Sequence, residues 1–108
     1  MNPETPARIQ GYATATDLPE NTLLEVTAGT RTIGLLRRGE SVFAFSATCP
    51  HAGHPLCEGW LDARGHIVCP LHGYRFSPDR GYNSSGEGYR LKTFPVQIRP
   101  EGIFVTLS

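Results

Sequence analysis

Short stretches of alternating apolar and polar residues, separated by turn residues, run along most of the chain. In the first half, Leu23–Thr27, Thr32–Arg37 and Ser41–Ala47 have the composition and length of β-strands. A glycine-containing turn follows each of the first two, which predicts antiparallel hairpins. Val42–Phe45 is continuously apolar, as expected of a buried central strand. Few windows carry a helical period.

The same alternation returns near the end of the chain. Arg90–Ile98 and Ile103–Leu107 alternate regularly and are joined by the turn Pro100-Glu101-Gly102. Ile9–Thr16 alternates more loosely and ends at the turn residues of 17–21. The whole pattern predicts an all-β fold in which two antiparallel sheets pack as a β-sandwich.

Residues 48–88 have a different texture. They hold seven of the twelve glycines and four of the nine prolines, and only His66–Cys69 and Tyr74–Phe76 look like strands. We therefore expect a single domain, residues 1–108, in which a loop-rich subdomain at about 48–88 is inserted into a β scaffold. That scaffold is expected at about 8–47 and 89–107.

The charge balance excludes one class of function. Ten basic and ten acidic side chains give a formal net charge of zero, and no basic stripe of a nucleic-acid binder is present. The N-terminus has no basic stretch followed by an apolar core, and no apolar run approaches the roughly 18–20 residues of a membrane helix. We expect a soluble, cytoplasmic protein that binds neither nucleic acid nor membrane.

Cysteine and histidine concentrate in the loop-rich region. Of the three cysteines and four histidines, four lie in Cys49-Pro50-His51 and Cys69-Pro70-Leu71-His72, with 17 residues between the two boxes. An odd number of cysteines beside histidines, in a reducing compartment, indicates metal binding or catalysis rather than a disulfide framework.

The spacing within the boxes bears on the metal. Zinc usually takes ligand pairs separated by two to four residues, and the single residue between Cys49 and His51 is tight for one small ion. A binuclear cluster suits the spacing better, because each box can give one thiolate and one imidazole to different irons. A structural zinc module stays as the less favoured alternative.

Together the two boxes and their Pro and Gly neighbours resemble the Cys-x-His and Cys-x-x-His boxes of Rieske iron–sulfur proteins. The resemblance covers about residues 8 to 107. It implies one [2Fe–2S] cluster, with Cys49 and Cys69 on an iron that stays ferric and His51 and His72 on the iron nearer the surface. It also implies a one-electron carrier, not catalytic alone, that serves an oxidoreductase system.

The resemblance leaves the partners open between two systems. One is the ferredoxin component of a ring-hydroxylating dioxygenase, which passes electrons from a flavoprotein reductase to a terminal oxygenase or other redox enzyme. The other is the small Rieske subunit of an NAD(P)H nitrite reductase. Neither box helps to choose, since both systems use this domain; we expect the dioxygenase ferredoxin and keep the nitrite reductase subunit as the alternative.

Departures from the high-potential Rieske branch indicate a low reduction potential. That branch has an extra cysteine in each box, whereas the matching positions here are His54 and Leu71, which cannot form its disulfide. Its Ser and Tyr hydroxyl donors correspond to Tyr74 and Phe76. A separate departure concerns the third cluster loop, which shields the cluster from solvent and commonly carries a proline in the family, whereas Ser84–Gly88 has none.

Several other residues have ordinary interpretations. We expect Cys57 to be a small buried hydrophobe, His54 a surface residue near the cluster edge, and His66 a solvent-facing strand residue. Trp60 is expected to pack in the core or a loop. Tyr74 is expected to act either as a wall beside the cluster or as a hydrogen-bond donor.

Overall fold

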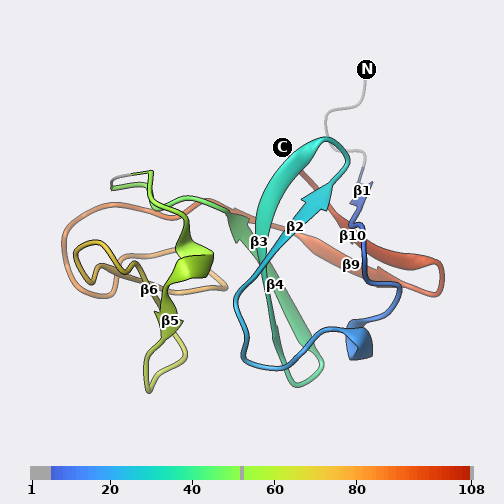
Figure 1. Ribbon diagram of the computed structural model, residues 1–108, viewed down its shortest axis with the longest axis horizontal. Helices are drawn as coiled ribbons and strands as arrows, with labels where there is room; N and C mark the ends of the chain where they lie inside the picture. Colours follow the sequence, from blue (N-terminus) through green and yellow to red (C-terminus); the bar gives the residue numbers. More distant parts are fainter. Residues whose placement is uncertain (1–5, 52, 108) are drawn as a thin grey trace.

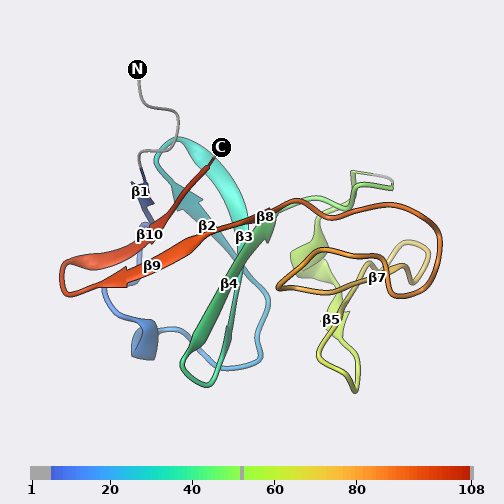
Figure 2. The same ribbon diagram turned by 180° about the vertical axis from the view of Figure 1, so that it is seen from behind.

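Three antiparallel sheets make up the computed structural model, which describes residues 6–51 and 53–107 (Figures 1 and 2). Their strand orders are β1-β10-β9, β2-β3-β4-β8 and β5-β6-β7. The strands are β1 (Ala7–Arg8), β2 (Leu24–Ala28), β3 (Arg31–Arg38), β4 (Ser41–Ser46), β5 (Trp60–Leu61), β6 (Ile67–Val68), β7 (Arg75–Phe76), β8 (Thr93–Phe94), β9 (Val96–Arg99) and β10 (Gly102–Val105). In the described part of the chain the helices are two single 3₁₀ turns, η1 (Ala15–Asp17) and η2 (Leu56–Glu58).

The first two sheets enclose one hydrophobic core. Its buried side chains come from both sheets and from the segment that follows β1, and we call this the first core: Ile9, Leu18, Val26, Ala28, Ile33, Leu35, Ala44, Phe94, Ile103 and Val105. Alternate residues of a strand point to opposite faces of its sheet. The arrangement confirms the predicted all-β sandwich.

The opposite face of β3 and β4 covers a second core. Leu36 and Phe45 lie on this face, next in sequence to the first-core residues Leu35 and Ala44. The rest of the second core comes from residues 47–92, the segment between β4 and β8 that we call the insertion: Cys49, Leu56, Ile67, Cys69, Phe76 and Leu91. β3 and β4 are therefore buried on both faces where they meet the insertion, and they support it through the second core.

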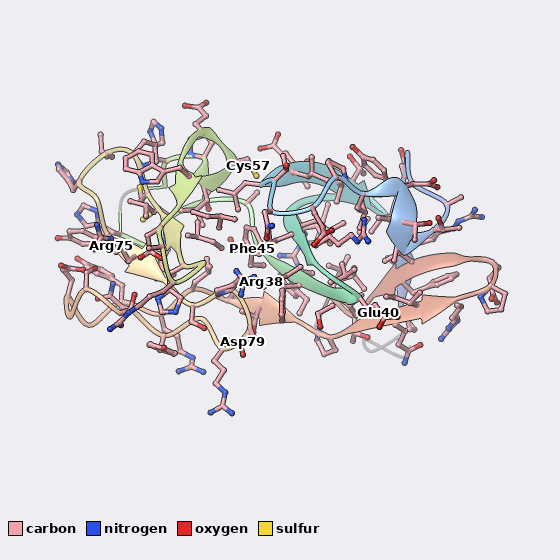
Figure 3. The ribbon with its side chains drawn as sticks, turned by 90° about the horizontal axis from the view of Figure 1, so that it is seen from below. Arg38, Glu40, Phe45, Cys57, Arg75 and Asp79 are labelled. Carbon is pink, nitrogen blue, oxygen red and sulfur yellow. The ribbon has the colours of Figure 1, made fainter. Side chains whose placement is uncertain are left out.

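Gly34 makes room for the largest side chain of that junction. Gly34 pairs with Phe45 across β3 and β4, and a Cβ atom on Gly34 would lie 2.1 Å from Cε2 of Phe45. Figure 3 shows Phe45 between the sandwich and the insertion, with Arg75 toward the far end of the insertion and Glu40 on the sandwich side.

The strands expected at the two ends of the chain differ from those observed. The loosely alternating Ile9–Thr16 does not continue as a strand: the chain turns into η1, and the carboxylate of Asp17 accepts hydrogen bonds from the backbone N–H groups of Ala13 and Thr14. The continuous strand expected at Arg90–Ile98 is two strands, β8 and β9, in different sheets. Pro95 separates them, and because proline has no N–H it interrupts a ladder.

The insertion carries the small sheet β5-β6-β7 and lies beside the end of the sandwich (Figure 1). Near the start of the insertion, shortly after β4, Thr48 and Pro55 form an antiparallel bridge. Among the residues that the structure describes, no helix has the length and apolar character needed to span a membrane.

Candidate metal centre

The two Cys/His boxes fold into turns with the same backbone hydrogen bonds. In the first, the N–H of Cys49 donates to the carbonyl of His54 at 2.8 Å, and the N–H of Gly53 donates to the carbonyl of Cys49 at 2.8 Å. In the second, Cys69 donates to Tyr74 at 2.8 Å and Gly73 donates to Cys69 at 2.9 Å.

The fifth residue of each turn is a glycine in the left-handed region. Gly53 has a φ of 70° and Gly73 a φ of 74°, which glycine adopts without the steric cost of a side chain. Because the two turns share one geometry, His51 and His72 occupy adjacent positions of that turn. His51 lies two residues after Cys49, and His72 lies three residues after Cys69.

Both cysteines lie in the second core. Cys49 is 2% exposed and Cys69 is 0% exposed, next to Leu56, Ile67 and Phe76. Thiolates in such surroundings are shielded from water, and a metal is a group that stabilises their charge there.

The histidines lie nearer the surface and close to each other. Their ring centroids are 4.9 Å apart with an interplanar angle of 61°. His51 is half-buried and His72 is exposed. Within the described part of the chain, Nδ1 of His51 is buried and has no hydrogen-bond partner. A buried imidazole nitrogen without a partner is costly unless it binds something else, so this atom fits a metal ligand.

Two tyrosines pack against His51. The ring of Tyr74 lies 4.1 Å from the His51 ring, centroid to centroid, at 31°. Tyr89, from the end of the insertion, lies 5.3 Å away at 61°. The packing supports the expectation that Tyr74 forms a wall of the site. Tyr89 was not identified from the sequence, because it lies far along the chain from both boxes.

The positions of the donor side chains favour a two-iron cluster over a single zinc ion. Within residues 6–51 and 53–107, no three His, Cys, Asp or Glu side chains are close enough together to hold one metal ion. Structural zinc takes four ligands around a single ion. A two-iron cluster takes two protein donors on each iron, which is compatible with a buried cysteine pair and a more exposed histidine pair.

A third turn repeats the frame of the two boxes. In Ser77-Pro78-Asp79-Arg80-Gly81-Tyr82, the N–H of Ser77 donates to Tyr82 at 2.9 Å and that of Gly81 donates to Ser77 at 2.8 Å. The sequence shows the same repeat. Each of Cys49, Cys69 and Ser77 is followed directly by a proline and, four residues on, by a glycine. Here the first position is a buried serine, whose hydroxyl donates to Asp79 and lowers the pKa of that carboxyl.

The structure agrees with the expectation for His54 and corrects the expectations for His66 and Trp60. His54 is a partly exposed residue paired with Glu58 at 3.1 Å. His66 is not simply solvent-facing, because Nδ1 of its half-buried ring lies 2.8 Å from Oγ of Ser84. Trp60 is 54% exposed, so the expectation that it packs is wrong. The reason is its place on β5, an edge strand of the small sheet.

Cys57 lies outside the two turns and is partly buried. Burial, followed by the nearby charge of Glu25, raises the pKa of the Cys57 thiol to about 11. The thiol is therefore protonated at neutral pH, in keeping with its expected role as a small hydrophobic residue.

Comparison with known proteins gives the family. A family model described as the Rieske [2Fe-2S] domain matches residues 9–95. The 3-phenylpropionate/cinnamic acid dioxygenase ferredoxin subunit of Photorhabdus laumondii subsp. laumondii is 29% identical over 96 residues, 88% of this chain and 90% of the relative. The cytochrome b6-f complex iron–sulfur subunit of Chlorobaculum tepidum is 29% identical over 94 residues, and this chain spans about half (51%) of its length.

Solved structures agree with the sequence relatives. The ferredoxin of carbazole 1,9a-dioxygenase from Nocardioides aromaticivorans IC177 has a TM-score of 0.83 at 27% identity, covering 96% of this chain and 99% of that chain. A chain in a complex of reduced oxygenase and oxidised ferredoxin of carbazole 1,9a-dioxygenase has a TM-score of 0.76 at 30% identity, covering 88% and 98%.

A structure described as an NADH-dependent nitrite reductase small subunit, from Mycobacterium tuberculosis, shares the fold. Its TM-score is 0.77 at 20% identity, covering 94% of this chain and 96% of that chain. The family model spans most of the sequence and both boxes. This chain therefore belongs to the Rieske [2Fe-2S] domain family, whose cofactor is one [2Fe–2S] cluster.

Proposed function

We propose that Cys49 and Cys69 bind one iron of the cluster, and that His51 and His72 bind the other. The observation that carries this assignment is the buried, partnerless Nδ1 of His51 beside the His72 ring, on turns that share one backbone frame with the cysteines. When bound, such a cluster accepts and releases a single electron.

The protein residues control access to that centre. The second core excludes water from the Cys49 and Cys69 side, while Tyr74 and Tyr89 pack against the ring of His51. His72 is exposed, and its neighbour Leu71 is 47% exposed. This leaves His72 and Leu71 as the tip that a redox partner can approach, with a short path from that partner to the histidine pair.

The proposal extends to the system that the carrier serves. It takes electrons from a flavoprotein reductase and delivers them to the terminal oxygenase of a ring-hydroxylating dioxygenase, in the cytoplasm, without catalysing the oxygenation itself. Two likenesses support it, since the dioxygenase ferredoxins described above match this chain over 90% and 99% of their own lengths. A nitrite reductase subunit is the competing system, and its support is a likeness of fold alone.

Ligand variants with matched controls test the binding site. C49S, C69S, H51Q and H72Q are expected to abolish or strongly reduce the visible absorption of the purified protein. C57S and H54Q change the same residue types a few positions away and are expected to keep it. Retention of the full spectrum by any of the first four would refute the assignment of that residue.

A reconstituted system tests the partners. Wild-type protein, an NADH-dependent flavoprotein reductase and a ring-hydroxylating oxygenase are expected to consume NADH and form hydroxylated product, and no product is expected without the oxygenase. Co-purification with a nitrite reductase large subunit, together with failure to support any oxygenase, would favour the competing system.

A further inference from the structure

The segment at residues 83–89 forms one side of the site, although it contains neither box. Tyr89 at its end packs on His51 and lies 5.9 Å from the ring of Tyr74. The segment has no proline and two glycines, Gly86 and Gly88, both with a φ of 88°. A stretch of this composition has high conformational entropy, so something else must hold it in place.

The carboxamide of Asn83 connects both ends of the segment. Its Nδ2 group, which carries two N–H donors, lies within hydrogen-bond distance of three acceptors: the carbonyl of Arg75 at 2.9 Å, Oγ of Ser85 at 3.1 Å and Oε1 of Glu87 at 3.0 Å. Its Oδ1 accepts from the N–H of Gly88 at 2.9 Å. One side chain therefore uses both its donor and its acceptor groups to close the loop.

Further hydrogen bonds fasten this loop to β7 and to the residue that precedes β6. The N–H of Arg75 donates to Oγ of Ser85 at 2.9 Å, and the N–H of Ser84 donates to the carbonyl of Arg75 at 2.9 Å. On the other side, the hydroxyl of Ser84 lies 2.8 Å from Nδ1 of His66. These contacts fix the loop to the small sheet, which also carries the residues leading into the second box.

The loop also holds a carboxylate, that of Glu87, two residues before Tyr89. Glu87 is fully exposed, but its carboxylate accepts hydrogen bonds from the Ser85 hydroxyl and from the Asn83 amide. The Ser85 hydrogen bond is the main cause that lowers the pKa of Glu87, with the Asn83 hydrogen bond next and electrostatic attraction to His51 contributing. Glu87 therefore keeps its negative charge at neutral pH, within electrostatic reach of His51.

We propose that Asn83 is a positioning residue for electron transfer. Its side chain holds the Glu87 carboxylate and the Tyr89 ring beside His51, and the Glu87 charge then lowers the reduction potential of the centre. A fixed negative charge opposes the arrival of an electron, and its effect at a solvent-exposed site falls with ionic strength. The effect on potential rests on the proposed function, in which His51 is an iron ligand. The positioning of the loop does not.

The charge is tested in the cluster-loaded protein with E87Q, which keeps the Oε1 acceptor and removes the charge. At one applied potential and low salt, the ratio of reduced to oxidised protein is expected to rise about three-fold over wild type, and the difference is expected to shrink in high salt. E101Q removes a matched charge in the turn between β9 and β10, far from His51 along the fold, and is expected to change nothing. Equal ratios for E87Q and E101Q would overturn the role of the charge.

The loop is tested by hydrogen–deuterium exchange of the amides at 84–89. N83A is expected to raise their exchange rates at least ten-fold and to shift the reduced-to-oxidised ratio in the same direction as E87Q. Q97A, which truncates an exposed amide side chain on β9, should leave both unchanged. Unchanged exchange in N83A would overturn the positioning role.

Two further measurements keep these outcomes separable. S85A removes one member of the same network and is expected to raise exchange in 84–89 by a smaller factor, which covers the case in which N83A does not fold. If the wild-type protein bound no [2Fe–2S] cluster, the proposed function would fail, while the exchange measurement would still decide whether Asn83 holds the loop.

Discussion

The phenol ring of Tyr74 lies against the imidazole of His51, with centroids 4.1 Å apart and planes inclined by 31°. Tyr74 ends the turn that carries the second box, and His51 belongs to the first box. The contact therefore joins the two turns on the histidine side of the site, as the second core joins them on the cysteine side.

This contact predicts different results for two substitutions of Tyr74. Y74F keeps the ring and should retain the cluster and its stability. Y74A removes the wall and should lower the free energy of unfolding by about 2 kcal/mol, as expected for loss of a half-buried aromatic ring. Thermal unfolding and the rate of bleaching in air measure the two effects. If Y74F lost the cluster as fast as Y74A, the hydroxyl rather than the packing would be the important feature.

The junction between the sandwich and the insertion depends on the pairing of Gly34 with Phe45. G34A introduces a Cβ atom 2.1 Å from Cε2 of Phe45, so we expect it to lower the free energy of unfolding by about 2 kcal/mol or more. Denaturant unfolding gives the value.

A double-mutant cycle provides the control for that clash. F45L alone should also destabilise the protein, since it leaves a cavity in the second core. In the double variant G34A/F45L the smaller side chain makes room for the new methyl group, so the loss should be less than the sum of the single losses. Strict additivity would show that G34A acts through another contact.

The sequence predicted the parts of this molecule that depend on local pattern. The strands of the middle sheet follow from alternation, and the two boxes follow from the spacing of Cys49, His51, Cys69 and His72. The break at Pro95 was not predicted, because alternation continues through it while the chain changes sheets.

Side-chain contacts between segments far apart in the chain could not be predicted from local sequence pattern. Tyr89 reaches His51 from 38 residues further along the chain, and the role of Asn83 depends on Arg75 and Gly88 being brought to it by the fold. The exposure of Trp60 depends on β5 being an edge strand, which two residues of sequence do not reveal.

Cys57 is expected to resist alkylation at neutral pH. Burial, with the charge of Glu25 adding, raises the pKa of its thiol to about 11, and the thiolate is the reactive form. Modification by iodoacetamide should therefore be slow at pH 8 and should accelerate as the pH approaches about 11. Mass spectrometry of intact protein follows the reaction. C57S is the control, and fast loss of the Cys57 thiol at pH 8 would contradict the expected protonation.

The same raised pKa sets the direction of a stability change. Because the folded protein holds this proton more tightly than the unfolded chain does, the contribution of Cys57 is complete at neutral pH and is lost as the pH rises toward 11. The unfolding free energy of wild type should therefore fall more steeply than that of C57S between about pH 9 and 11. Parallel curves for the two proteins would contradict this linkage.

The reduction potential should lie at the low end of the Rieske range of roughly −150 to +300 mV. Phe76 is fully buried in the second core and offers no hydroxyl, Tyr74 packs its ring on His51, and the Glu87 charge opposes reduction. Protein-film voltammetry gives the midpoint. A value well above about +100 mV would contradict the low-potential assignment.

The central claim is that His51 and His72 bind one iron of a two-iron cluster held on its other side by Cys49 and Cys69. Pulsed electron paramagnetic resonance of the reduced protein, grown with ¹⁵N-labelled histidine, tests it most directly. We expect strong couplings from the ring nitrogens of both His51 and His72, of which one disappears in H51C and the other in H72C wherever the cluster is retained. A spectrum without histidine couplings, or a protein that holds a single zinc ion and gives no signal on reduction, would contradict it.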